Sequence, residues 1–149
     1  MGVQVSWDTE KEQPPARRAA FASMTAVTAG DKDAWLALFA PDAVVEDPVG
    51  PSMFDAEGKG HHGPEGISAF WDMTIGNVER FEFIIRDSHA AGDEVANVGT
   101  ITTYLPGGHR VDTDGVFVYR VGEDGLIRSM RAYWETERAM ATARQVEGE

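Results

Sequence analysis

The stretch from Val111 to Trp134 reads VDTDGVFVYRV, GEDG, LIRSMRAYW, and this stretch decides the fold class. Two runs rich in β-forming residues flank the turn Gly122–Gly125, which is the pattern of a β-hairpin. Side chains alternate between the two faces of a strand, so the hairpin has one face of core candidates. On the first strand these are Phe117, Tyr119 and Val121, and on the second they are Arg128, Met130, Ala132 and Trp134.

Two further strands precede this hairpin. A long run from Val95 to Leu105 reaches it through Pro106-Gly107-Gly108, a turn sequence. Upstream, residues 81–86 alternate between apolar and polar side chains, and a polar segment, 87–93, predicts a loop after them. The sequence therefore predicts four strands joined mainly by hairpins, which gives an antiparallel or mixed sheet.

Three helices are predicted ahead of these strands. The first starts at Pro14-Pro15 and stops near Gly30, and the second runs from its cap at Asp31 to Pro41 and carries Phe39. The third starts at Pro64 and ends near Gly76. A short β-type run at residues 43–47 separates the second helix from a glycine-rich loop.

Helices followed by strands indicate an α+β fold. We expect a cone-shaped α+β barrel in which three helices pack on a curved sheet and enclose a hydrophobic pocket. Residues 14–136 form this single domain. Residues 1–13 are interpreted as a polar N-terminal tail, and residues 137–149 as a charged C-terminal extension.

The composition of the 149-residue chain limits its function. The formal net charge is −12, which argues against binding nucleic acid or an anionic membrane, since both need Lys and Arg. The chain has no cysteine, which excludes disulfides and thiol chemistry. Its longest apolar run, residues 34–40, is too short to span a membrane. We expect a cytoplasmic protein without a cofactor.

Asp47 is the most informative single residue. It ends the apolar run, shares one face with Ala43 and Val45, and precedes Pro48, which favours an extended backbone. If that face looks inward, burial raises the pKa of the carboxyl group and makes it a competent general base. The alternative is that Asp47 starts a turn and faces water.

Three other motifs have simpler interpretations. Gly58–Gly63 matches G-x-G-x-x-G but lacks the strand that a dinucleotide site needs before it, so it is interpreted as a loop. His61 and His62 lack ligand partners at a recognised spacing, so no metal site is predicted. Asp112–Gly115 resembles part of a calcium loop without its later acidic ligands.

Segments spread over residues 17–136 resemble the ketosteroid isomerase (steroid Δ5-3-isomerase) family of the SnoaL-like, nuclear-transport-factor-2-like superfamily. The segments that carry the resemblance are GDKDAW (30–35), LFAPDAVVEDPVG (38–50), HGPEGISAFW (62–71), YRV (119–121) and GLIRSMRAYW (125–134). The actinobacterial members of this group share the Asp-x-x-Gly loop and the GVFxYRV strand. The resemblance implies the same conical fold and a hydrophobic small-molecule pocket.

The resemblance also implies a role for each matching residue. Asp47 matches the base that moves a proton from C4 to C6 of a 3-oxo-Δ5-steroid. In the family, a tyrosine and a protonated aspartic acid stabilise the dienolate oxygen, the worked example of raised carboxyl pKa values. Here Ser23 and Phe117 stand at those two positions, and Tyr119 is a substitute donor. The other implied pocket residues are Phe39, Trp71, Met130, Ala132 and Trp134.

Three functions follow from this resemblance. The first is proton transfer by Asp47 on a steroid-like carbonyl compound, with a non-standard oxyanion hole. The second is a steroid-binding module with little turnover, favoured by the loss of donors. The third is polyketide cyclisation or epoxide hydrolysis; the latter needs an Asp–Arg–Asp network, for which Arg128 is the candidate arginine. A homodimer through the outward set Ile127, Ser129, Arg131 and Tyr133 is also expected.

Overall fold

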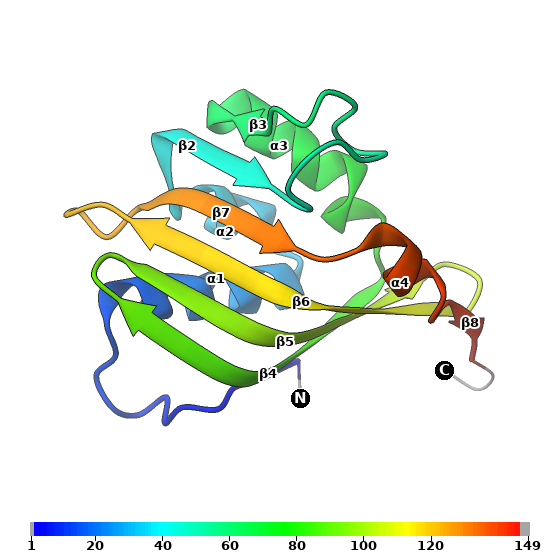
Figure 1. The fold of residues 1–149 in the computed structure, drawn as a ribbon, viewed down its shortest axis with the longest axis horizontal. Coiled ribbons are helices and arrows are strands. Elements are labelled where there is room, and N and C mark those ends of the chain that lie inside the picture. The colour runs from blue at the N-terminus through cyan, green and yellow to red at the C-terminus, as the bar shows by residue number, and fades with distance from the viewer. Residues whose placement is uncertain (1, 147–149) are drawn as a thin grey trace.

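The computed structural model describes residues 2–146 and consists of one curved sheet with helices on its inner side (Figure 1). The strands follow the order β1-β4-β5-β6-β7-β2-β3, with β8 beside β6. Their bounds are β1 Val3–Gln4, β2 Phe39–Glu46, β3 His61–His62, β4 Arg80–Ala91, β5 Glu94–Leu105, β6 His109–Val121, β7 Ile127–Tyr133 and β8 Arg144–Gln145.

The sheet is mixed, as the sequence predicted. Strands β4 to β7 pair in antiparallel fashion through the expected hairpins. Strand β2 pairs in parallel with β7, and β1 pairs in parallel with β4. The two ends of the sheet do not meet, so the barrel stays open, and the helices that precede β4 in the chain lie on its concave side (Figure 1).

The helices begin close to the predicted positions, but the second one ends at Leu36, before the predicted Pro41. They are α1 Pro15–Ala29, α2 Lys32–Leu36, α3 Gly63–Met73, the 3-10 helix η1 Ile75–Asn77 and α4 Thr136–Met140. Gly30 ends α1 with a φ of 67°, a left-handed conformation that glycine adopts without steric cost. Asp31 caps α2 by accepting a hydrogen bond from the Ala34 N–H at 3.1 Å. The α+β class is confirmed.

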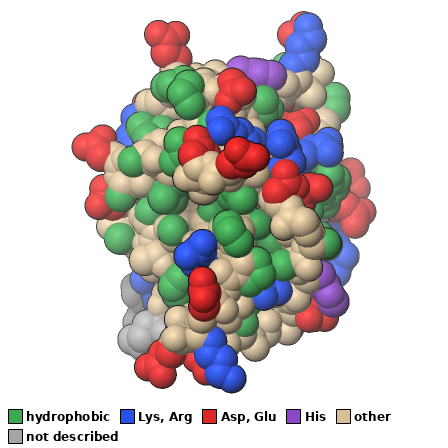
Figure 2. Space-filling view, turned by 90° about the vertical axis from the view of Figure 1, so that its left-hand side faces the viewer, with side chains coloured by type: hydrophobic (Ala, Val, Ile, Leu, Met, Phe, Trp, Pro, Cys, Tyr) green, Lys and Arg blue, Asp and Glu red, His purple; other side chains and the backbone are tan. Residues whose placement is uncertain are grey.

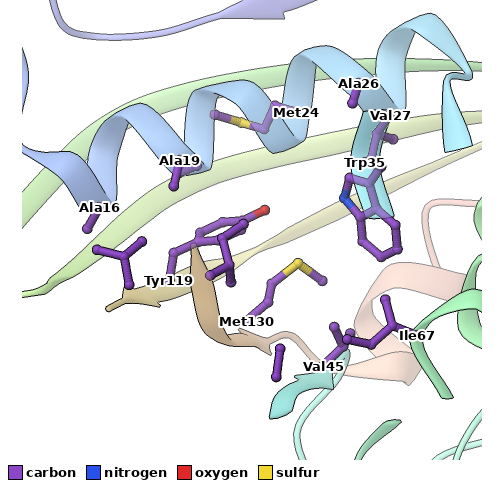
Figure 3. Close-up of a cluster of buried hydrophobic side chains, with 14 of the residues drawn as sticks. Ala16, Ala19, Met24, Ala26, Val27, Trp35, Val45, Ile67, Tyr119 and Met130 are labelled. Carbon is purple, nitrogen blue, oxygen red and sulfur yellow. The ribbon is translucent and has the colours of Figure 1, made fainter. Parts of the chain in front are cut away.

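One hydrophobic core joins α1 to the sheet. Met24 and Val27 of α1 belong to one buried cluster with Tyr119, Met130 and Trp35, and Figure 3 shows Val27 beside Trp35. None of the helices in residues 2–146 is long and apolar enough to cross a membrane. On the face that Figure 2 shows, acidic and basic side chains are spread among apolar ones.

Two segments differ from the predicted elements. Phe39 lies in β2 rather than on the second helix, because β2 pairs with β7 from Phe39 opposite Ile127 onward. Pro41 is tolerated within this strand because the pairing shifts between Phe39 and Val44. The predicted loop 87–93 is mostly strand: β4 continues to Ala91 after a bulge, which breaks the alternation that the sequence pattern relies on.

Both terminal segments contain ordered elements. Val3 and Val5 pack on the core, and β1 extends the sheet within the segment that was interpreted as a tail. The C-terminal extension forms α4 and then β8, whose Gln145 pairs with His109. Residues 147–149 of that extension lie outside the described residues.

Candidate functional site

A cavity of about 70 Å³ lies between α1 and the inner face of the sheet. Its wall is almost wholly apolar and has four polar side chains, those of Ser23, Asp47, Asn97 and Tyr119. The remaining lining residues are Met24, Val27, Trp35, Ile75, Phe81, Phe83, Ile85, Ile101, Phe117, Met130 and Ala132. An apolar pocket with a few convergent polar groups is the usual form of a small-molecule site.

Asp47 stands at the end of β2 and turns into this cavity. The backbone carries it there because the Val49 N–H donates to the Ala132 carbonyl oxygen of β7 at 2.9 Å, which fixes the chain after the strand. The Trp134 indole N–H donates to Asp47 Oδ1 at 2.6 Å. Burial raises the pKa of Asp47 above its ordinary value, and the bond from Trp134 opposes this only in part.

A second set of polar groups lines the cavity where α1 faces β6. The Trp35 indole N–H donates to Ser23 Oγ at 3.0 Å, and Ser23 Oγ lies 3.0 Å from the Tyr119 hydroxyl. Burial raises the pKa of Tyr119 to about 12, so its hydroxyl keeps its proton. The three groups have three hydrogens and share two hydrogen bonds, so one hydroxyl hydrogen remains for a ligand.

Asn97 is the polar lining residue that the sequence prediction missed. It is 1% exposed, and its Oδ1 accepts a hydrogen bond from Ser88 Oγ at 2.6 Å. The sequence of β5 contains a pattern that could have indicated this residue. The inward positions alternate with outward ones, and Asn97 is the one polar side chain among the inward set Val95, Asn97, Gly99 and Ile101. An asparagine on an otherwise apolar strand face indicates a specific polar contact.

The predicted site residues divide into two groups. Six line the cavity: Ser23, Asp47, Phe117, Tyr119, Met130 and Ala132. Trp134 acts on the site through its hydrogen bond to Asp47. Phe39 and Trp71 lie outside the lining, because both pack on Trp35, with ring centroids 4.7 Å and 5.4 Å from it. They support the wall through that indole.

Two predictions about the last strand are corrected by the structure. Arg128 does not line the cavity; its guanidinium pairs with Asp42 at 3.2 Å and Asp124 at 3.0 Å near the β6–β7 turn. Ile127 does not belong to an outward set, since it is 0% exposed in the core. A pairing shift at Arg120–Val121 moves this end of β7 out of simple alternation.

The glycine-rich segment has a structural role. Asp55 accepts hydrogen bonds from the N–H groups of Gly58 and Gly60, and these bonds lower the pKa of its carboxyl group. His61 packs on Phe70, with centroids 4.9 Å apart, and His62 Nε2 lies 2.7 Å from the Lys59 carbonyl oxygen. Within residues 2–146, no three His, Asp or Glu side chains gather as a metal site would require.

The fold is that of the ketosteroid isomerase-like class of proteins. The family model for the SnoaL-like domain matches residues 20–130. The chain therefore belongs to the SnoaL-like domain family of the nuclear-transport-factor-2-like superfamily.

Solved structures support the same assignment. The crystal structure of RV0760c from Mycobacterium tuberculosis matches with a TM-score of 0.81 at 34% identity, over 90% of this chain and 98% of that one. A second structure of RV0760c is a complex with estradiol-17β-hemisuccinate and has a TM-score of 0.78 at 35% identity, over 89% and 99% of the two chains. The Δ5-3-ketosteroid isomerase from a Mycobacterium species has a TM-score of 0.79 at 34% identity, over 89% and 98%.

A curated relative carries a different activity. The epoxide hydrolase LasB from Streptomyces lasalocidi is 32% identical over 121 residues. The match covers 79% of this chain and 40% of LasB, so the chain spans less than half the length of that relative.

Proposed function

We propose that this protein catalyses proton transfer next to a carbonyl group of a steroid-like or other polycyclic hydrophobic compound, with Asp47 as the general base. The observation that carries the proposal is the Asp47 carboxylate, which lines an apolar cavity and has a raised pKa. A carboxylate in such surroundings holds a proton more strongly than one in water. General-base catalysis of this kind contributes about 10²- to 10⁴-fold.

The reaction needs no redox step. In a β,γ-unsaturated ketone, Asp47 takes the proton from the carbon between the carbonyl and the double bond, and the bonding electrons move to the carbonyl oxygen to give a dienolate. The Ser23–Tyr119 pair donates its free hydroxyl hydrogen to that oxygen. The proton then returns from Asp47 to the far carbon of the conjugated system, so the product is an isomer of the substrate.

The apolar wall of the cavity suits a polycyclic ligand if the cavity widens to admit it. Its wall contains no lysine or arginine, so it fits a neutral ligand better than an anionic one. Its 70 Å³ exceeds the space of one water but is smaller than such a ligand. Met24 and Met130 line it, and their unbranched side chains can change rotamer to admit a larger molecule. The steroid complex of RV0760c supports this ligand class.

A specific observation favours the second candidate, a binding module with little turnover. Phe117 faces the cavity where the family has an acidic donor, so this position offers the dienolate oxygen no hydrogen bond. One lost oxyanion donor typically costs 10²- to 10³-fold in rate. Proton transfer in this chain should therefore be slower than in a two-donor isomerase.

The third candidate, epoxide hydrolysis or cyclisation, has less support from the site. LasB favours it by sequence similarity. However, Asp47 is the single carboxylate among the cavity-lining residues, and Arg128 pairs with Asp42 and Asp124 outside the cavity. An Asp–Arg–Asp network would need residues from elsewhere in the chain.

The decisive experiment measures Δ5-to-Δ4 conversion of androst-5-ene-3,17-dione, together with exchange of solvent deuterium into the product. The wild type should show both, and Asp47→Asn should lower the rate about 10³-fold. Asp42→Asn is the matched control, because Asp42 is an exposed carboxylate on the same strand and should keep the wild-type rate. A wild type that binds the steroid without conversion or exchange would favour the binding module.

We also propose that two copies pair through the outer face of the sheet. Val98, Val116 and Tyr133 lie on adjacent strands there, and Val98 and Tyr133 are 37% and 43% exposed. Apolar side chains gathered on one face are typical of a protein interface. Sedimentation of the wild type and of Tyr133→Asp tests this, since the substitution should shift a dimer toward monomers.

A further inference from the structure

Asn97 has a donor that the fold itself does not use. The side chain lines the cavity, and its Nδ2 is a buried nitrogen with no hydrogen-bond partner among residues 2–146. Leaving a buried polar group without a partner is unfavourable, because the group loses its hydrogen bonds to water. Such groups are uncommon in native proteins, so each one calls for a specific explanation.

The orientation of this amide is fixed by a chain of donors. The Arg17 guanidinium can only donate, and its Nε donates to Ser88 Oγ at 2.9 Å. The Ser88 hydroxyl hydrogen is therefore free to point onward, and Ser88 Oγ lies 2.6 Å from Asn97 Oδ1. The oxygen end of the amide faces Ser88, so the NH₂ end must point the other way.

The strand register places this donor beside the proposed reaction site. Asn97 stands directly opposite Phe117 on β6, and Phe117 stands opposite Ala132 on β7. Tyr119 is the diagonal neighbour of Asn97, and Cα atoms in that relation lie about 7–8 Å apart. Asn97, Phe117 and Tyr119 therefore line the cavity from adjacent positions on β5 and β6, and the phenyl ring of Phe117 supplies no hydrogen bond.

We infer that Asn97 Nδ2 binds an oxygen acceptor of the ligand, a ketone or hydroxyl, and that Ser88 and Arg17 are positioning residues for this contact. The inference depends on the proposed function only in placing an oxygen-bearing polycyclic ligand in the cavity. It does not require turnover. The wall has no cation to match a charged group, so the acceptor is a neutral oxygen.

Equilibrium binding tests the inference. The quenching of tryptophan fluorescence, to which the cavity-lining Trp35 contributes, reports ligand affinity. The probes are androst-4-ene-3,17-dione and the two compounds that each lack one of its ketones. The wild type should bind one of the single ketones about tenfold more weakly than the diketone. Asn97→Leu should bind the diketone about tenfold more weakly and lose that preference.

Further variants separate this role from a structural one. Ser88→Ala should reduce the same preference, because the amide is then free to rotate. Thr102→Val is the matched control on the same strand, since Thr102 donates to Asp112 at 2.8 Å and does not line the cavity. It should keep the wild-type preference. If Asn97→Leu does not fold, as judged by thermal unfolding, Asn97→Val replaces it.

The inference is overturned if the folded Asn97 variant discriminates among the three ketones as the wild type does. It is also overturned if the wild type binds all three equally or binds none of them. The probes are Δ4 compounds, so no isomerisation is needed. A protein that passes this test but shows no proton transfer would contradict the proposed function and leave the role of Asn97 intact.

Discussion

Two polar sites line one apolar cavity, and each receives a hydrogen bond from an indole. Trp134 donates to the Asp47 carboxylate at 2.6 Å, and Trp35 donates to the Ser23 hydroxyl at 3.0 Å. Burial raises the pKa of both Asp47 and Tyr119, but the consequence differs. At Asp47 burial favours gaining a proton, whereas at Tyr119 it favours keeping one.

This difference teaches how one environment can supply both a base and a donor. A carboxylate and a phenol both lose solvation of their charged forms, so both pKa values rise. The pKa of the carboxyl group rises toward the range of a useful base, while that of Tyr119 rises to about 12, where it remains a donor. Trp134 donates to one oxygen of the Asp47 carboxylate and leaves the other oxygen for the ligand. Trp35 donates to Ser23 Oγ and leaves one hydroxyl hydrogen of the Ser23–Tyr119 pair for the ligand.

Loss of the Tyr119 hydrogen-bond donor should lower the isomerisation rate more than loss of the hydrogen bond from Trp134. Tyr119→Phe keeps the ring but removes its hydroxyl, and it should lower the isomerisation rate about 10²-fold. Steady-state kinetics should show this mainly in kcat, because the dienolate exists only after binding. Ser23→Ala should cost less, since it leaves the Tyr119 hydroxyl in place. An unchanged kcat in Tyr119→Phe would exclude this residue as the donor.

Changing the base side should shift the pH dependence. Trp134→Phe removes the hydrogen bond that lowers the pKa of Asp47, so this pKa should rise further. Hydrogen bonds to charged groups contribute about 1.5–3 kcal/mol, so the shift should be on the order of one pH unit. The acidic limb of the kcat/KM profile should move to higher pH by that amount. A profile that moves to lower pH would contradict the role given to Trp134.

The smallest expected effect is on stability. Because burial raises the pKa of Asp47, ionisation of this group in the folded protein is unfavourable, and its contribution to stability is lost as pH rises through that pKa. Asp47→Asn should therefore be more stable at neutral pH, by about 1 kcal/mol or roughly 3 °C in Tm. The advantage should shrink as pH falls toward the ordinary value of 3.8. Thermal unfolding at several pH values checks both signs.

Much of this arrangement could be predicted from local sequence. The turn Gly122–Gly125, the left-handed Gly30 and the Asp31 cap depend on a few neighbouring residues, and each is where the pattern placed it. The inward face of the hairpin followed from simple alternation, so Phe117 and Tyr119 were placed in the wall. Local chemistry decides such features.

The rest depends on contacts between distant segments. Phe39 belongs to a strand because it pairs with Ile127 of β7, which is far away in the sequence. The residues around Phe39 do not indicate that pairing. Strand alternation alone predicts that Arg128 faces the cavity, but its guanidinium pairs with two acidic residues near the β6–β7 turn. The orientation of the Asn97 amide depends on its hydrogen bond with Ser88, which a shift in strand pairing brings opposite it.

That shift in β4 has a consequence for how the pocket could change. Arg86 is the extra residue: Ile85 pairs with Gly99, and Asp87 already pairs with Val98. Bulges of this kind bend a strand and increase its twist. Deleting Arg86 would keep every inward side chain in its present register while straightening this part of the wall. The volume and outline of the pocket can thus vary separately from its chemistry, through the insertion or loss of a single exposed residue.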